Sequence, residues 1–246
     1  MFAMTCSYLT TTPRILWYWV GLAQATFTRT GNPWNGSDLA MALNQFDVFS
    51  ACNRCPVAFT GMFRRVDYLT SVRPEFESDF YDVHQLLHYF TVPEYMSVVP
   101  QGTIKAMKSG PRKTTPHGTT FDISFGDRRI PDYLTKFGKD GERLIYMCTE
   151  VKFKREDLEL CLTQLAEQLQ TVFQSGRSSP HGVLGLALMG VYGQLYFQTD
   201  EHSSMEALTP WMHVTYSRLS TTMRTCLIGL HAQTTLSLEP DADASP

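Results

Sequence analysis

The chain lacks an excess of charge of either sign, because its 21 Lys and Arg residues face 24 Asp and Glu residues, for a formal net charge of −3. A general attraction of the whole surface for polyanions is therefore excluded, and any polyanionic partner must be held by a local basic patch. The hydrophobic fraction of 43% is ordinary for a globular protein with a substantial core. The 246 residues suit one larger domain, or a domain with a small extension.

The chain also has few cysteines and no long hydrophobic run. Of its 6 cysteines only Cys52 and Cys55 are close in sequence, and a chain of this length needs no disulfides. A zinc site joining this pair to His84 and His88 is disfavoured, because the gap between the pairs exceeds the usual finger spacing. The apolar segment at 14–27 is shorter than the roughly 20 residues that span a bilayer, and it lacks the charge pattern of a signal peptide. We expect an intracellular protein, nuclear or cytoplasmic, without membrane contact.

Motifs of several enzyme classes are missing. The sequence has neither the G-x-S-x-G turn of serine hydrolases nor a P-loop, and it contains no internal repeat. A serine hydrolase or a P-loop nucleotidase therefore has no local support.

Apolar residues at helical spacing predict two helices. The first opens at Pro74 and ends before Pro93, with an apolar stripe formed by Phe76, Phe80, Val83, Leu87 and Phe90. The second covers residues 155–174 and is stopped by Gly176, with an apolar face formed by Leu158, Cys161, Leu162, Leu165, Leu169, Val172 and Phe173.

Between and after these helices, alternating or apolar runs predict strands. A meander is expected at 119–126, 128–137 and 143–154, with Phe121, Ile123 and Phe125 on one face of its first strand. Further strands are expected at 182–190 and 194–200. The order helix, three strands, helix, strand indicates an α/β fold, a mixed sheet flanked by helices.

The hairpin between the second and third strands carries Asp132, Glu150 and Lys152. Glu150 and Lys152 share a face, since residues two apart on a strand point the same way. A two-residue turn would place Asp132 on the other face, opposite Thr149. A three-residue turn with a glycine bulge would place it opposite Cys148, on the face of the other two, and a bulge at Pro131 would serve equally. We expect the three side chains to converge.

Two converging carboxylates suit Mg²⁺ or Mn²⁺, which prefer oxygen ligands. A lysine beside such a metal can orient an attacking water or neutralise charge that develops at phosphorus. The alternative is that the three residues form a salt bridge on a structural domain's surface.

Pro131-Asp132 followed by Glu150-Val151-Lys152 resembles the motif of the PD-(D/E)xK nuclease superfamily, and the likeness covers about residues 74–198. The combination also resembles small fungal proteins that carry this nuclease core. The resemblance implies a restriction-endonuclease-like fold, with Asp132, Glu150 and the backbone carbonyl of Val151 as metal ligands and Lys152 as catalytic lysine. It implies a phosphodiesterase that acts on nucleic acid; we expect DNA as the substrate, with RNA as the alternative. The alternative is a nuclease-fold nucleic-acid-binding or protein-interaction module that has lost turnover.

Members of this superfamily often add an acid from the first helix, for which Glu77 is the candidate. Exonuclease members carry Gln-x-x-x-Tyr on the second helix; here Gln164 and Gln168 have no matching tyrosine, so an endonuclease is favoured and Gln164 is the candidate site residue. Phosphate contacts are expected from a basic group of residues, Lys105, Lys108, Arg112, Lys113, Arg128, Arg129, Lys154 and Arg155. A homodimer would suit the cutting of two strands.

The domain organisation follows from these elements. We expect an N-terminal extension at 1–70 packed on the core, the nuclease-like core at 71–200, a C-terminal elaboration at 201–238, and a disordered acidic tail at 239–246.

Overall fold

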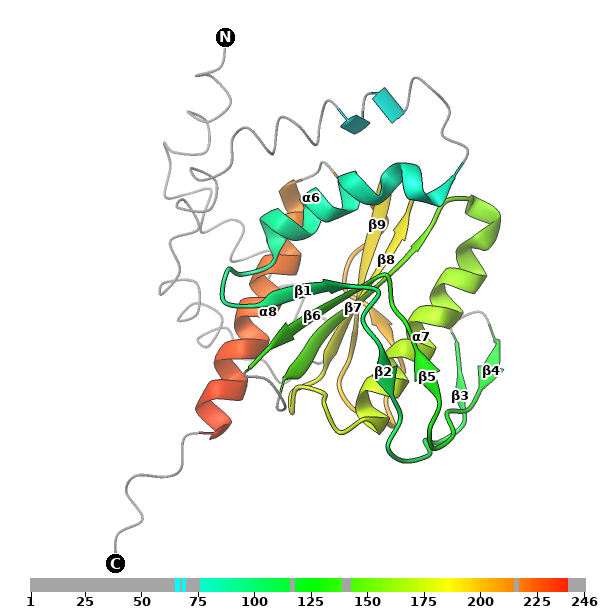
Figure 1. The fold of residues 1–246 in the computed structure, drawn as a ribbon, viewed down its shortest axis with the longest axis vertical. Helices are drawn as coiled ribbons and strands as arrows, with labels where there is room; N and C mark the ends of the chain where they lie inside the picture. The colour runs from blue at the N-terminus through cyan, green and yellow to red at the C-terminus, as the bar shows by residue number, and fades with distance from the viewer. Residues whose placement is uncertain are drawn as a thin grey trace, which may run out of the picture.

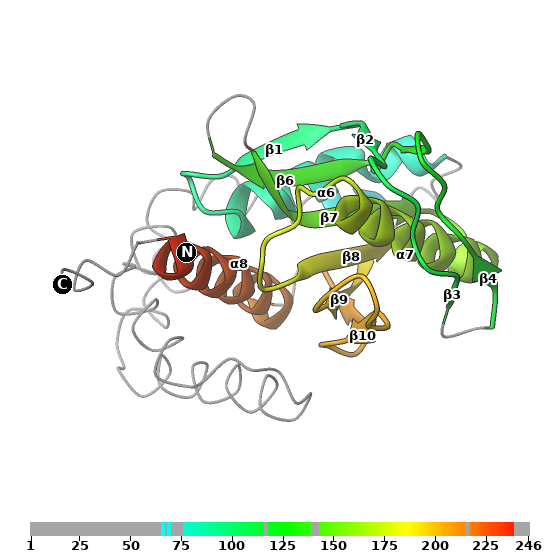
Figure 2. The ribbon, with the colours of Figure 1, turned by 90° about the horizontal axis from the view of Figure 1, so that it is seen from below.

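The computed structural model describes residues 65–66, 68–69, 76–115, 118–138, 143–214 and 217–238. Its centre is a seven-stranded sheet in the order β1-β6-β7-β8-β9-β10, with β11 paired to β9 (Figure 1). The sheet is mixed but mostly antiparallel, since only β7 and β8 run parallel. Helix α7 covers one face and helices α6 and α8 cover the other, so two apolar clusters form the core (Figures 1 and 2).

The strands of the main sheet are β1 (Ser97–Pro100), β6 (Tyr133–Phe137), β7 (Leu144–Lys152), β8 (Val183–Met189), β9 (Tyr192–Gln198), β10 (Glu206–Ala207) and β11 (Met212–His213). Two small sheets lie beside α7, formed by β2 (Ile104–Lys105) with β5 (Arg128–Arg129) and by β3 (Lys113–Thr114) with β4 (Thr120–Phe121). The helices are η1 (Glu77–Phe80), α6 (Tyr81–Thr91), η2 (Arg155–Asp157), α7 (Leu158–Gln174) and α8 (Ser217–Leu238).

The first predicted helix is present as η1 followed by α6. Its apolar stripe is confirmed at Phe80, Val83 and Leu87, which are buried in the core. The stripe is wrong at Phe76, whose side chain is 65% exposed because it precedes the first helical residue. The helix ends at Thr91, two residues before Pro93, as the sequence predicts. Pro74, expected to open it, lies outside the described residues.

The second predicted helix and the two later strands are confirmed. Residues 155–174 form η2 and α7, and the predicted apolar face of α7 packs on β7 and β8. Gly176 follows with a φ of +67°, a left-handed conformation that favours glycine at a helix end. The apolar run at 182–190 gives β8, and the run at 194–200 forms most of β9.

The predicted first strand of the meander is wrong. Only Thr120–Phe121 is a strand, and it pairs in a two-stranded sheet. Ile123 is buried whereas Phe125 is 68% exposed, because the chain turns here instead of continuing as an alternating strand. The place beside β6, on the side away from β7, is taken by β1, a strand that was not predicted from the sequence.

The predicted second strand, 128–137, is divided into two. Arg128–Arg129 forms β5 and pairs with β2, whereas Tyr133–Phe137 forms β6 and pairs with β1 and β7. Pro131 lies at the break, where its missing N–H removes a donor from any continuous ladder. Asp132 therefore stands at the point where the chain enters the main sheet.

The register of the hairpin differs from the predicted one. Leu134, not Asp132, lies opposite Cys148, and the register shifts between Thr135 and Lys136. The shift is a β-bulge, in which Tyr146 is the extra residue. Ile145 and Cys148 consequently pack in the α7-side cluster, while the adjacent Tyr146 and Met147 both pack on the opposite side.

The bulge decides which way the acids point. Lys136 pairs with Ile145 near the turn, and Tyr133 pairs with Thr149 beyond the bulge, so continuation of that pairing brings Asp132 beside Glu150. Without the extra residue, Asp132 would face the opposite side of the sheet. The predicted convergence is confirmed, although neither the predicted turn register nor the alternative bulge at Pro131 produces it.

The residues after β9 add the short strands β10 and β11 and the helix α8. Helix α8 contributes Leu219, Met223 and Leu227 to the apolar cluster that also holds α6. Among the described residues, no helix is both long and apolar enough to cross a membrane. The predicted extension up to residue 64 and the acidic tail at 239–246 lie outside the described residues.

Candidate active site

Asp132 and Glu150 meet where β6 begins and β7 ends, on the side of the sheet that faces α7. One carboxylate oxygen of Asp132, Oδ2, accepts a hydrogen bond of 2.7 Å from the backbone N–H of Val151. This bond ties the residue before β6 directly to the residue after Glu150. The Asp132 carboxylate is therefore held by a backbone group of β7.

Lys152 is the cation of the site. Its Nζ lies 2.5 Å from Glu150 Oε1, 2.8 Å from the backbone oxygen of Val151 and 4.0 Å from Glu77 Oε2. The side chains of Lys152 and Glu150 are only 15% and 6% exposed. The pair is therefore largely buried and not on the surface, and a buried pair carries a desolvation cost that a surface pair avoids.

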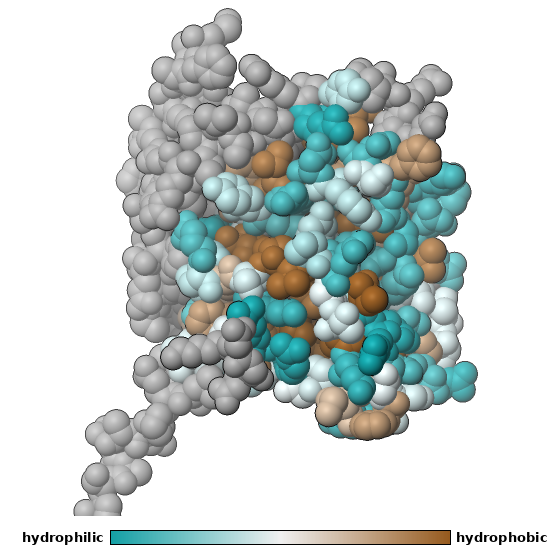
Figure 3. Space-filling model, viewed as in Figure 1, coloured by the Kyte–Doolittle hydropathy of each residue, from teal (hydrophilic) through white to brown (hydrophobic). Residues whose placement is uncertain are grey.

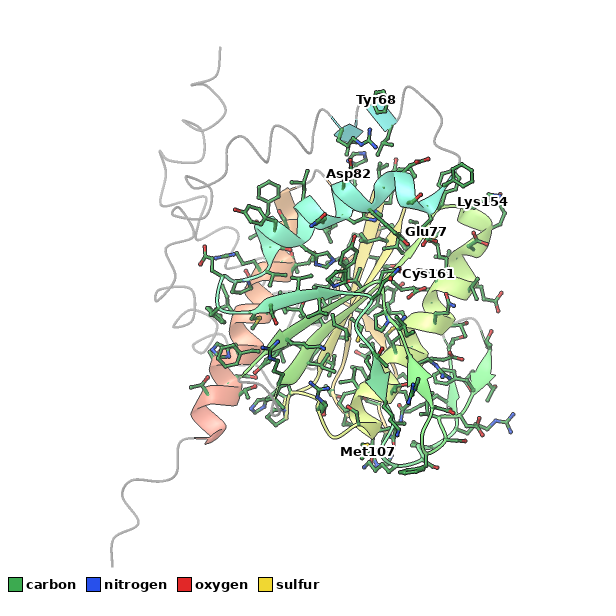
Figure 4. All side chains as sticks on the ribbon, in the orientation of Figure 1. Tyr68, Glu77, Asp82, Met107, Lys154 and Cys161 are labelled. Carbon is green, nitrogen blue, oxygen red and sulfur yellow. The ribbon has the colours of Figure 1, made fainter. Side chains whose placement is uncertain are left out.

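Glu77 joins the site from η1, in front of the first full helix. Figure 4 shows Glu77 pointing from η1 toward the end of β7 and the first turn of α7, where Cys161 lies. The hydroxyl of Tyr81 lies 2.9 Å from Glu77 Oε1 and 3.4 Å from Asp132 Oδ1. Tyr81 thus bridges the two acids and holds Glu77 toward the sheet.

Tyr81 is a site residue that the sequence analysis missed. The available signal was its position four residues after Glu77, which places both on one helix face. Its own backbone is fixed in turn, since the Tyr133 hydroxyl donates to the Tyr81 carbonyl at 3.2 Å. Strand β6 therefore positions Tyr81 as well as Asp132.

Helix α7 contributes Gln168 and not the predicted Gln164. The side-chain amide of Gln168 donates to Glu150 Oε2, while Lys152 occupies the other carboxylate oxygen. Gln164 lies one turn earlier on α7, and its buried Oε1 has no hydrogen-bond partner in the described structure. The two glutamines share a helix face, so spacing alone could not distinguish them.

Burial and crowding perturb the ionisation of these groups. Burial raises the pKa of Asp132, against the lowering effect of the Val151 N–H, and the charge of Glu77 raises it further. Burial likewise raises the pKa of Glu150, partly offset by its hydrogen bond from Lys152. Burial lowers the pKa of Lys152, but the hydrogen bond with Glu150 and the charge of Glu150 together outweigh burial, so the pKa of Lys152 rises. Burial, followed by the hydrogen bond with Glu77, raises the pKa of Tyr81.

The charges of the cluster do not balance. Asp132, Glu150 and Glu77 bring three potential negative charges, and Lys152 is the one cation that acts on both Asp132 and Glu150 in the described structure. The Lys152 ammonium contacts Glu150 Oε1 and the Val151 carbonyl oxygen. Oxygens of these two kinds are the ligands that a hard metal cation prefers. The donor set and the excess negative charge therefore fit Mg²⁺ or Mn²⁺.

A closed protein cage for a metal is absent from the described residues, where no three His, Cys, Asp or Glu side chains converge closely enough. In proteins Mg²⁺ is commonly held by one or two carboxylates, with waters and substrate phosphates as its other ligands. His84 and His88, by contrast, are fully buried in α6, where His84 Nε2 contacts the Gly190 carbonyl at 2.7 Å and the His88 ring packs at a tilt against the Tyr133 ring. The cysteines of the discounted zinc site lie outside the described residues.

Some of the predicted basic residues contact other groups of the protein, whereas others are only exposed to solvent. Lys108 pairs with Glu201 at 3.0 Å, Arg129 pairs with Glu167 at 3.0 Å, and Lys113 donates to the Ser203 carbonyl at 2.9 Å. Burial lowers the pKa of Lys113. The remaining predicted basic residues with described side chains are exposed, and these are Lys105, Arg112, Arg128 and Lys154. The side chain of Arg155 lies outside the described residues.

Comparison with known proteins adds no relative: no family model matches the sequence, no curated protein matches it, and no solved structure matches its fold.

Proposed function

We propose that the protein is a metal-dependent nuclease that hydrolyses phosphodiester bonds of DNA. The observation that carries the proposal is the convergence of Asp132, Glu150 and Lys152, with Glu77 beside them, at one end of the sheet. A purely structural role explains this poorly, because a buried cluster with excess negative charge costs stability. Function is the physical reason for keeping such a cluster.

The order of elements supports the proposal. Helix α6, strands β1, β6 and β7, helix α7 and strand β8 follow the order that the PD-(D/E)xK resemblance implies. Strand β7 pairs antiparallel with β6 and parallel with β8, and it carries two of the motif residues at its end. We infer a restriction-endonuclease-like core from this order, with β1 as the first strand of the meander.

The residues take separate roles in the proposed reaction. Asp132, Glu150 and the Val151 carbonyl would hold the metal, and Glu77 would add negative charge beside them. Bound there, Mg²⁺ or Mn²⁺ supplies Lewis acidity toward a phosphate oxygen and a lowered pKa for a water. Lys152 places a positive charge where negative charge develops at phosphorus, or orients the attacking water. Gln168 and Tyr81 hold the carboxylates in place.

One observation favours the alternative of a binding module without turnover. Both oxygens of Glu150 and both oxygens of Asp132 already contact protein donors. In the nuclease, Lys152 and Tyr81 must release part of these contacts when a metal binds. Retention of them in the presence of Mn²⁺ would leave a site that cannot activate water.

The test is cleavage of labelled single- and double-stranded DNA and RNA with Mg²⁺, Mn²⁺ or EDTA. Wild type is compared with Asp132→Asn and Lys152→Met, which keep the size of each side chain. The proposal expects cutting by wild type that EDTA abolishes and that each variant reduces by a factor of 100 or more, on the order of a lost electrostatic catalytic contact. Cutting that survives in folded Asp132→Asn would refute it.

A further inference from the structure

Upstream of Asp132 the chain forms a small projecting unit, the basic ribbon, defined as residues 104–108 and 124–129. It contains β2, β5 and the turn that precedes β5. Residues 104–108 anchor the ribbon on α7. The backbone N–H groups of Met107 and Lys108 both donate to the Gln174 carbonyl at the end of α7, and Ile104 is buried against that helix.

Two like charges face each other across this ribbon. Lys105 and Arg128 are direct partners in the β2–β5 pairing, and both side chains are exposed. Like charges directly opposite on neighbouring strands are destabilising. Neither forms an ion pair in the described part of the chain, and the nearby acid Asp127 is engaged with the Ser124 N–H at 2.9 Å. An anion that bridges the two cations would remove this repulsion.

The tip of the ribbon presents apolar groups to solvent. The side chains of Phe125 and Met107 are 68% and 60% exposed. Figure 3 shows apolar surface at the lower edge of the molecule, where Figure 4 places Met107. An exposed ring beside unpaired cations is the combination with which proteins bind single-stranded nucleic acid, because bases stack on the ring while cations follow the backbone.

Phe125 is held by a rigid turn. The Asp127 N–H donates to the Ser124 carbonyl at 3.0 Å, and Gly126 has a φ of +88°, so Phe125 is the second residue of a type II turn. Its own N–H donates to Ser109 Oγ at 3.1 Å, and the Gly126 N–H donates to the Ala106 carbonyl at 3.0 Å. An exposed ring on a fixed backbone loses little further entropy when it stacks.

The ribbon is continuous with the acidic site. Only Arg129, Ile130 and Pro131 separate Arg128 from Asp132, a span of about 13 Å for four residues of extended chain. A strand whose phosphates contact Lys105 and Arg128 therefore reaches the site within a few nucleotides. Ile130 is 61% exposed on this path, which leaves it open to a ligand.

We propose that the basic ribbon binds single-stranded nucleic acid, with a base stacked on Phe125 and phosphates at Lys105 and Arg128, and leads an unpaired strand to Asp132. This inference rests on the proposed function for its last step and on the ribbon itself for the binding. The substrate class is therefore a single strand, or a duplex with an unpaired end or flap.

The test is fluorescence anisotropy with labelled dT20, rU20 and a 20-base-pair DNA duplex, in EDTA so that nothing is cut. Wild type should bind both single strands more tightly than the duplex. Phe125→Ala should weaken single-strand binding about tenfold, the loss of one stacked base. The matched control, Tyr89→Ala, removes a 65%-exposed ring on α6 and should leave binding unchanged.

The charge pair has its own readout. In the double variant Lys105→Gln, Arg128→Gln the slope of log K against log salt concentration should flatten by about 1.4, which is roughly 0.7 per lost phosphate contact to a single strand. Binding that prefers the duplex, or is absent, or does not respond to Phe125→Ala, overturns the ribbon proposal even if cleavage is metal-dependent. Conversely, Phe125-dependent binding without any cleavage overturns the proposed nuclease function and supports the ribbon proposal.

Discussion

Removal of Lys152, the cation that contacts Glu150 in the acidic cluster, should destabilise the fold, and a divalent metal should restore its stability. In Lys152→Met the alkyl chain is kept, but the carboxylates of Glu150, Asp132 and Glu77 lose their shared positive partner. Loss of one partner of a buried ion pair costs about 3–5 kcal/mol. Because Lys152 is 15% and Glu77 is 32% exposed, we expect the lower end, about 3 kcal/mol.

Thermal unfolding measures this effect. For a chain of this size 1 kcal/mol shifts Tm by about 2–4 °C, so Lys152→Met should melt about 6–12 °C below wild type in EDTA. Mn²⁺ should return most of the difference, since it replaces the missing charge among the same oxygens. The matched control is Lys154→Met, an exposed lysine on the same segment, which should melt like wild type. Equal melting of Lys152→Met and wild type, or no response to Mn²⁺, would refute the charge argument.

Three further predictions follow from individual contacts. Tyr81→Phe removes the hydroxyl that bridges Glu77 and Asp132, and should slow Mn²⁺-dependent cleavage about tenfold; an unchanged rate would remove Tyr81 from the site. Gln168→Leu leaves Glu150 Oε2 without its donor and should cost about 1–3 kcal/mol in urea unfolding, whereas Gln164→Leu should cost less; the reverse order would contradict the observed pairing. Burial lowers the pKa of His84 to about 4 and of His88 to about 3, so each contributes stability that is complete above pH 6.5 and is lost as the pH falls toward the folded pKa. His88→Phe should remove about 1.4 kcal/mol per pH unit from the slope of unfolding free energy between pH 6 and 4, and an unaltered slope would show that His88 protonates without cost.

The helices could be predicted from the sequence because their signal is redundant. The stripe on α7 repeats over several turns, and a single misplaced residue would not hide it. In the first helix, Phe76 continues the apolar spacing but lies before the first helical residue and is exposed. Periodicity therefore locates a helix better than it locates the helix end.

The register of the hairpin could not be predicted for a physical reason. From Leu144 to Cys148 every residue of β7 is apolar, so alternation carries no information about which side chain faces which layer. The sheet accommodates the extra residue at Tyr146 because apolar side chains are buried on both of its faces. Strand β1 was missed for a different reason, since its four residues at 97–100 are too few to show a period.

The candidate site was predicted in part. The motif gave Asp132, Glu150 and Lys152, whose convergence the structure confirms. It could not give Tyr81 or Gln168, since their roles depend on how α6 and α7 cross the sheet, which local sequence does not encode. Both could have been named as candidates from their spacing, since Tyr81 lies one turn after Glu77 and Gln168 lies one turn after Gln164.

The most direct test of the central claim is the cleavage rate of an oligonucleotide with one phosphorothioate, supplied as each pure diastereomer, in Mg²⁺ and in Mn²⁺. If a metal held by Asp132 and Glu150 contacts the scissile phosphate, sulfur at the contacted position should slow cleavage in Mg²⁺, a hard cation that prefers oxygen. Mn²⁺ should restore the rate for that diastereomer. No cutting by wild type, or the same sulfur effect with both metals, would contradict a metal-dependent nuclease at this site.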